Sequence, residues 1–477
     1  MRSLASFSKN AAMLLVARAV DLLFSIAVVA VITRYFGREV YGQYAVLMAV
    51  VLTLTSMAHL GIPKIVIREI AQNHGAANHF LGAALMLSGL MFPVVALAAA
   101  ITSRCLQFDA SLSVALWLAI AAELIHTLVG AFGSVFLARE RMELDAAVTL
   151  ATRLVFFAIL LVVVVNKLGL TCLFAAMLVA NALALLLAAT LCRRCLGVRP
   201  SFGASLDTLR HLFTEAIPVG ATFILLQFLQ YVDVFVLKLL RGFEDVALFQ
   251  APYVLVCKSQ FVGRIVVLSL APLFARMALS ENRGSLGPFY TTLAKYALFV
   301  CLPVCFLALF FRNELVTLFF GAHFLPAAAV FSVIIWSVPL IIVDLISDVT
   351  LVSLGKQRRV LANTFAGLVV NAALDFALIP SYGSVGAGMA SMTALAFVFA
   401  LNLQLVWRNA PQVNVFRIFC LPLLLMGGAL AVGTVLAPLG AGISLVAASA
   451  LYGISLLLVF RRSGAELNAL ILAIRTA

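Results

Sequence analysis

A set of ionisable side chains lies within long apolar stretches of this 477-residue sequence. Burying a charge among apolar residues is costly, so such groups usually line an internal path or pair with one another. Their chemistry would be ion and anion binding. The set comprises Arg18, Asp21, Glu123, His126, Arg153, Asp233, Lys258, Arg264, Lys295, Asp344, Asp348 and Asp375.

The cations in this set are candidate binding residues for a phosphorylated substrate, because Arg and Lys are natural counter-ions for phosphate. The alternative is that each cation pairs with a buried acid or extends to the membrane surface. The candidates are Arg18, Arg153, Lys258, Arg264 and Lys295.

Three acids, Asp21, Asp344 and Asp348, are candidates for binding a proton or a cation. Asp344 and Asp348 are four residues apart, so they lie on one helical face, where two like charges favour sharing a proton or a cation. Arg18 and Asp21 are three residues apart and can contact each other. Each acid has the alternative of pairing with a cation on another helix.

We find no motif for enzymatic chemistry. The sequence contains no phosphate-binding loop, no cluster with metal-ligand spacing and no nucleophile constellation. We therefore expect neither an enzyme nor an ATP-driven pump, and no metal or other cofactor. Most of the eight cysteines lie in apolar runs, which is typical of small buried hydrophobic residues rather than of disulfides.

The composition predicts a membrane protein. Hydrophobic residues make up 64% of the chain and charged residues 11%, with a mean hydropathy of +1.16. Apolar runs of about 20 residues, enough to cross a bilayer, recur throughout, and in lipid such runs form helices. We expect about fourteen spans, at 11–33, 43–62, 80–103, 112–137, 146–166, 170–192, 213–238, 246–275, 289–311, 325–352, 360–380, 383–407, 415–436 and 440–460.

The distribution of basic residues predicts the orientation. With the N-terminus in the cytoplasm, the cytoplasmic loops carry roughly three times as many Lys and Arg residues as the opposite loops. We therefore expect both termini in the cytoplasm and an even number of helices. The net charge of +13 reflects this orientation rather than nucleic-acid binding.

The chain also repeats itself. The stretch LARERMELDAAVTLATRLVFF at Leu137 is similar in pattern to LGKQRRVLANTFAGLVVNAAL at Leu354. Two parallel six-helix lobes are expected, at 1–200 and 201–410, an arrangement that places a substrate path between them. Residues 411–477 would add helices 13 and 14 and a short C-terminal amphipathic segment.

The stretch from Leu354 to Leu395 carries a family resemblance. Its basic loop, Asn-containing helix, "IP", "YG" and "GAGMAS" together resemble helices 11 and 12 of polysaccharide flippases. These transport O-antigen or exopolysaccharide units and belong to the multidrug/oligosaccharidyl-lipid/polysaccharide superfamily.

The resemblance implies the substrate and the setting. A polyprenyl-diphosphate-linked oligosaccharide would cross the bacterial inner membrane by alternating access, with proton or sodium as the coupling ion. Membrane lipid, a polysaccharide polymerase and chain-length proteins would be partners. Three alternatives remain: a multidrug antiporter that uses Asp21, Asp344 and Asp348, a peptidoglycan-precursor flippase, and a membrane scaffold that transports nothing.

Overall fold

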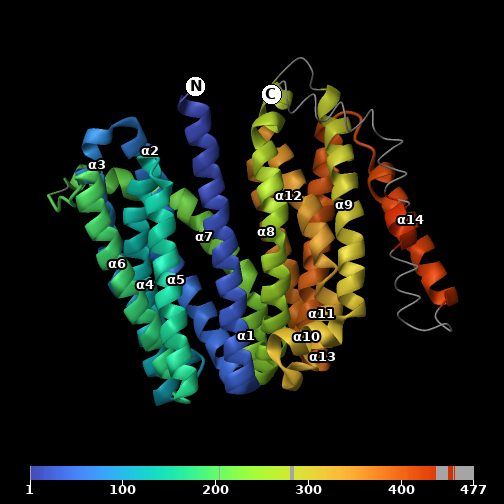
Figure 1. Ribbon diagram of the computed structural model, residues 1–477, viewed down its shortest axis with the longest axis horizontal. Helices are drawn as coiled ribbons and strands as arrows, with labels where there is room; N and C mark the ends of the chain where they lie inside the picture. Colours follow the sequence, from blue (N-terminus) through green and yellow to red (C-terminus); the bar gives the residue numbers. More distant parts are fainter. Residues whose placement is uncertain (1, 204, 280–283, 437–449, 455, 457–477) are drawn as a thin grey trace. The chain divides into compact units, whose positions relative to one another are not determined.

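The computed structural model describes residues 2–203, 205–279, 284–436, 450–454 and 456, and all regular structure in these ranges is helical (Figure 1). Within them, nine helices are long and apolar enough to cross a membrane. Two of the nine, Val20–Gln72 and Gln357–Asn409, have 53 residues each. The first covers part of the predicted span 11–33 and all of 43–62, and the second contains the predicted spans 360–380 and 383–407. A straight helix of that length would measure about 80 Å, far more than the bilayer core. The predicted all-helical fold is confirmed.

The chain forms two compact units. Unit 1 comprises Met1–Ala251 together with Phe319–Phe324, and unit 2 comprises Pro252–Leu318 and Leu325–Ala477. The predicted six-helix repeats at 1–200 and 201–410, with 411–477 as an added pair, stay a prediction.

Unit 1 contains a long first helix that is broken by a glycine. Gly37 has φ 79° and ψ −174°, a conformation that side chains disfavour, and it separates the predicted spans 11–33 and 43–62. The elements of the unit are α1 (Arg2–His59), α2 (Ile62–Gln72), η1 (His74–Ala76), α3 (Ala77–Cys105), α4 (Ala110–Ala138), α5 (Met142–Val165), α6 (Leu170–Leu196), α7 (Leu206–Leu240), the start of α8 (Phe243–Leu279) and η3 (Ala322–Phe324).

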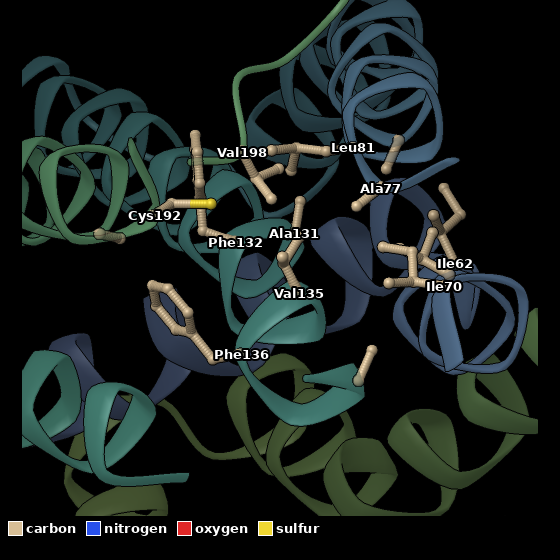
Figure 2. Packing of buried hydrophobic residues seen from close by; sticks show 14 of the residues in the cluster. Ile62, Ile70, Ala77, Leu81, Ala131, Phe132, Val135, Phe136, Cys192 and Val198 are labelled. Atoms are coloured by element: carbon tan, nitrogen blue, oxygen red, sulfur yellow. The ribbon is translucent and has the colours of Figure 1, made fainter. Parts of the chain in front are cut away.

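One core cluster of unit 1 combines apolar residues of α2 to α7, and a second combines residues of α1, α3, α4 and α6. Figure 2 shows Ile62 and Ile70 of α2 near Ala77 of α3, Leu81 of α3 beside Val198, and Phe132 of α4 beside Cys192 of α6. Small residues let helices approach closely in a membrane, and α4 and α6 are rich in buried alanines along their contact. The side-chain amide of Asn181 on α6 donates to the carbonyl of Ala122 on α4 at 2.8 Å.

Residues 319–324 pack on α1 next to the break at Gly37. The Arg38 guanidinium donates to the His323 carbonyl at 2.5 Å, and His323 Nε2 lies 2.7 Å from the Thr33 carbonyl oxygen. The buried ring of Phe324 meets Tyr41 edge-on with centroids 5.9 Å apart. Phe319–Phe324 therefore belongs to unit 1, although the chain before and after it belongs to unit 2.

Unit 2 contains a second long helix with a break, at Gly383, where φ is 54°. The predicted span 360–380 ends at Pro380, but the helix continues through Pro380 to Gly383. The two arms pack tightly, because a Cβ on Gly367 would lie 2.2 Å from the Val398 side chain. The elements of the unit are the rest of α8, α9 (Leu286–Phe310), most of α10 (Arg312–Phe320), α11 (Ala327–Ile334), α12 (Ser337–Ser353), α13 (Gln357–Asn409) and α14 (Val415–Leu436).

Two segments differ in detail from the sequence expectation. The predicted span 325–352 is divided into α11 and α12, and the loop expected after residue 62 contains α2. Most of the predicted span 440–460, and the amphipathic segment after it, lie outside the described residues.

The contact of α9 with the chain after α13 gives a stability test. A Cβ on Gly287 would lie 1.8 Å from the Pro411 carbonyl oxygen, so Gly287→Ala should cost about 1–3 kcal/mol and lower the unfolding temperature in detergent. Gly130 has open space around its Cβ position, so Gly130→Ala should be neutral or stabilise by up to about 1 kcal/mol. Equal unfolding temperatures for the two variants would contradict this packing.

Candidate functional site

The first polar cluster lies in unit 1, between α1 and α5. Arg153 Nε donates to Asp21 Oδ1 at 2.6 Å. The Arg153 side chain keeps 40% of its surface exposed and Asp21 keeps 22%. A predicted substrate cation and a predicted coupling acid thus form one ion pair.

Two further polar groups belong to the surroundings of this pair. Tyr44 on α1 lies within electrostatic range of both Arg153 and Glu123 of α4. Its ring stacks on Phe174 of α6, with centroids 5.6 Å apart. The polar groups of α1, α4 and α5 therefore gather in one part of unit 1.

The second polar cluster lies in unit 2, where Asn402 connects both predicted acids of α12. Its side-chain amide donates to Asp344 Oδ1 at 3.0 Å and to Asp348 Oδ1 at 3.3 Å. The carbonyl oxygen of the same side chain accepts from Asn363 Nδ2 at 2.8 Å. Asn402 is 1% exposed, so the cluster ties α12 to both arms of α13 in a buried place.

Sequence reasoning missed Asn402. A signal was present, because Asn402 is an amide inside the apolar run 383–407, and a polar side chain in such a run needs a partner. Which partner it finds depends on how α12 packs on α13, which local sequence does not show.

The other predicted binding residues lie on α1, α8 and α9. Lys295 is 7% exposed on α9, with Nζ 5.0 Å from the centroid of the Tyr296 ring. Lys258 is half-buried on α8. The side chains of Arg18 and Arg264 lie outside the described residues. Binding by Arg18, Arg153, Lys258, Arg264 and Lys295, and ion coupling by Asp21, Asp344 and Asp348, stay predictions.

One group of potential metal ligands occurs among the described residues. Ligand atoms of Glu69, His211 and Glu215 lie within 4.8 Å of one another, between α2 and α7. The Arg68 guanidinium already contacts both carboxylates, at 2.6 Å from Glu69 and 2.5 Å from Glu215. The group is therefore an ion-pair network with its own cation.

Comparison with protein families gives one match. The family model described as "Polysaccharide biosynthesis protein" matches residues 7–278. A comparison with curated proteins found no match.

Solved membrane transporters share the fold. The lipid II flippase MurJ in an inward closed conformation superposes with a TM-score of 0.75 at 12% identity, covering 95% of this chain and 99% of that one. An inward-facing multidrug resistance MATE family transporter of the MOP superfamily gives 0.65 at 14% identity, with 80% and 94% covered. A MOP superfamily transporter from Pyrococcus furiosus gives 0.57 at 13% identity, with 84% and 95% covered. The predicted transporter fold is confirmed.

The Asn402 cluster gives a second stability test. Asn402→Leu removes the donor to two carboxylates and the acceptor for Asn363, and each buried group that loses its partner costs about 1–3 kcal/mol. We expect a clearly lower unfolding temperature of the purified protein.

Asn409 provides the matched control, because its amide donates only to a carbonyl of its own helix, that of Leu405. Asn409→Ala should change the unfolding free energy by no more than about 0.5 kcal/mol. If both variants unfold at the same temperature, Asn402 does not hold α12 and α13 together.

Proposed function

Because the chain belongs to the polysaccharide biosynthesis protein family, within the multidrug/oligosaccharidyl-lipid/polysaccharide superfamily, we propose that it is a lipid-linked oligosaccharide flippase. Its substrate is a polyprenyl-diphosphate-linked repeat unit, moved from the cytoplasmic to the outer leaflet of a bacterial inner membrane. The product serves the assembly of O-antigen or exopolysaccharide.

One observation carries the proposal. The family match over residues 7–278 includes the helices that hold Asp21 and Arg153 within apolar stretches. Arg153 is partly exposed beside its bond to Asp21, and a guanidinium in such surroundings is suited to binding a second anion at some stage of the cycle. A diphosphate provides that anion, and its planar oxygen pairs match the geometry of arginine.

The mechanism that fits is alternating access. The saccharide and its diphosphate enter a polar path while the prenyl chain stays in lipid. The Asp344–Asp348 pair is the candidate site for a coupling proton or sodium ion. The termini lie in the cytoplasm, and a polymerase and chain-length proteins take over the product.

Two related functions remain as alternatives. A peptidoglycan-precursor flippase is favoured by the superposition that covers 95% of this chain. A multidrug antiporter is supported by the superposition on a MATE family transporter, which covers 80% of this chain. The longer match favours a flippase over an antiporter.

Deletion of the gene in its host tests the function directly. We expect loss of a surface glycan and accumulation of its lipid-linked repeat unit on the cytoplasmic leaflet. An intact glycan, together with raised sensitivity to cationic drugs, would support the antiporter instead.

Lys258→Ala tests whether this cation contacts the substrate. Because the diphosphate needs counter-charges along its path, we expect surface glycan to fall to the level of the deletion strain while the amount of membrane protein stays normal. Arg358 is an exposed residue in the first turn of α13, and Arg358→Ala should leave the glycan unchanged. Wild-type glycan in the Lys258→Ala strain would remove Lys258 from the site.

A further inference from the structure

The contact between α1 and α5 assigns a specific role to an acid. We infer that Asp21 is a positioning residue, which holds Arg153 so that its two terminal NH₂ groups face the phosphate-bearing headgroup of the substrate. The inference rests on the proposed flippase function, and it replaces ion coupling as the role of Asp21.

The hydrogen bond of Arg153 to Asp21 uses only the Nε edge of the guanidinium. A guanidinium has five N–H donors in a rigid plane, and the bond to Asp21 uses the one on Nε. Among the described residues, no other oxygen lies within hydrogen-bond distance of the Arg153 guanidinium. The segment of α1 before Val20, whose side chains are not described, contains no carboxylate. The edge formed by Nη1 and Nη2 thus remains available for a second anion.

The register between the two helices is fixed one turn further along. Phe24 of α1 meets Phe157 of α5 edge-on, with centroids 5.7 Å apart and planes at 81°. Phe24 is three residues after Asp21, and Phe157 is four residues after Arg153, so each pair shares one helical face. The aromatic contact and the ion pair therefore stabilise the same packing of α1 on α5. Together they fix the position of the Arg153 guanidinium.

The exposed part of Arg153 does not belong to the main apolar surface of either helix. On α1, Leu23 is strongly exposed and lies roughly 200° around the helix from Asp21. On α5, the exposed residues Leu154 and Leu161 lie roughly 100° and 80° around the helix from Arg153. Arg153 is turned from these residues toward α1 by its bond to Asp21.

The fork geometry determines the class of ligand. Two parallel donors on one edge match two oxygens of a phosphate or diphosphate group, and lysine does not provide this arrangement. A mobile guanidinium would first have to be ordered, which weakens binding. By holding Nε, Asp21 removes that cost, although its own negative charge repels the anion.

Ordering of Arg153 by Asp21 raises the affinity for the anion, whereas the negative charge of Asp21 lowers it. The role of Asp21 can therefore be tested by substitution. If Asp21 only neutralises Arg153, removing its charge strengthens anion binding. If Asp21 positions Arg153, removing the acceptor weakens binding. The probe is farnesyl diphosphate, titrated into the full-length protein in detergent, with farnesol to measure binding of the tail alone.

We expect Arg153→Leu and Asp21→Leu each to weaken farnesyl diphosphate binding by about tenfold or more. Asp21→Glu keeps the charge but moves the carboxylate by one methylene group, and it should also weaken binding. Asp21→Asn keeps an acceptor oxygen for Nε–H, so it should stay within about threefold of the wild type. Arg358→Ala is the control for a cation outside the site.

Folding is checked by the unfolding temperature and the elution profile of each variant. If Asp21→Leu does not fold, Asp21→Glu and Asp21→Asn decide the question, because positioning predicts that the charged variant binds worse than the neutral one. Charge neutralisation predicts no loss with Glu and a gain with Asn.

Failure of the inference and failure of the function give different results. If Arg153→Leu weakens binding while Asp21→Leu and Asp21→Glu bind as tightly as the wild type or tighter, the positioning role is wrong and the flippase proposal stands. If the wild type binds farnesyl diphosphate no better than farnesol, and deletion of the gene leaves the surface glycan intact, both proposals fall.

Discussion

The hydrocarbon core of a bilayer offers no hydrogen-bond partners, so every polar group in a membrane-spanning helix has to find one within the protein or on its substrate. Among the described residues, many Ser and Thr hydroxyls bond a carbonyl of their own helix, whereas several larger polar groups bond across helices. Asn181 reaches a carbonyl of α4, Asn402 connects α12 with both arms of α13, and Asp21 bonds Arg153 of α5. Because these partners are distant in sequence, the same contacts that satisfy polar groups also determine which helices pack together.

The two polar clusters differ in how many of their hydrogen-bonding groups have a partner within the protein. In unit 2, both the donor and the acceptor of the Asn402 side chain are used, and the residue is buried. In unit 1, the bond to Asp21 uses one donor of Arg153, and the side chain stays partly exposed. A closed network contributes to stability, whereas an incompletely used guanidinium is suited to binding. Stability and binding can therefore be changed separately by substitutions in the two clusters.

The sequence was sufficient to predict the helices, because apolar runs of bilayer length have few other solutions. It also located the turn before the second arm of α13 to within a few residues, although the break is at Gly383 and not at Pro380. It missed α2, which lies where a loop was expected after residue 62, because an 11-residue amphipathic helix has no long apolar run. The contacts of Asn402 and Arg153 depend on packing between distant helices, and no local pattern reveals them.

The division of the chain has a consequence for its connectivity. The polypeptide passes from one compact unit to the other at three points, after Ala251, after Leu318 and after Phe324. The first point lies inside the continuous helix α8 and directly before Pro252, which has no backbone N–H to donate to the preceding turn. The third adjoins Phe324, which is anchored on α1. The two units are thus joined by three covalent connections, and the first of them lies at a proline inside a helix.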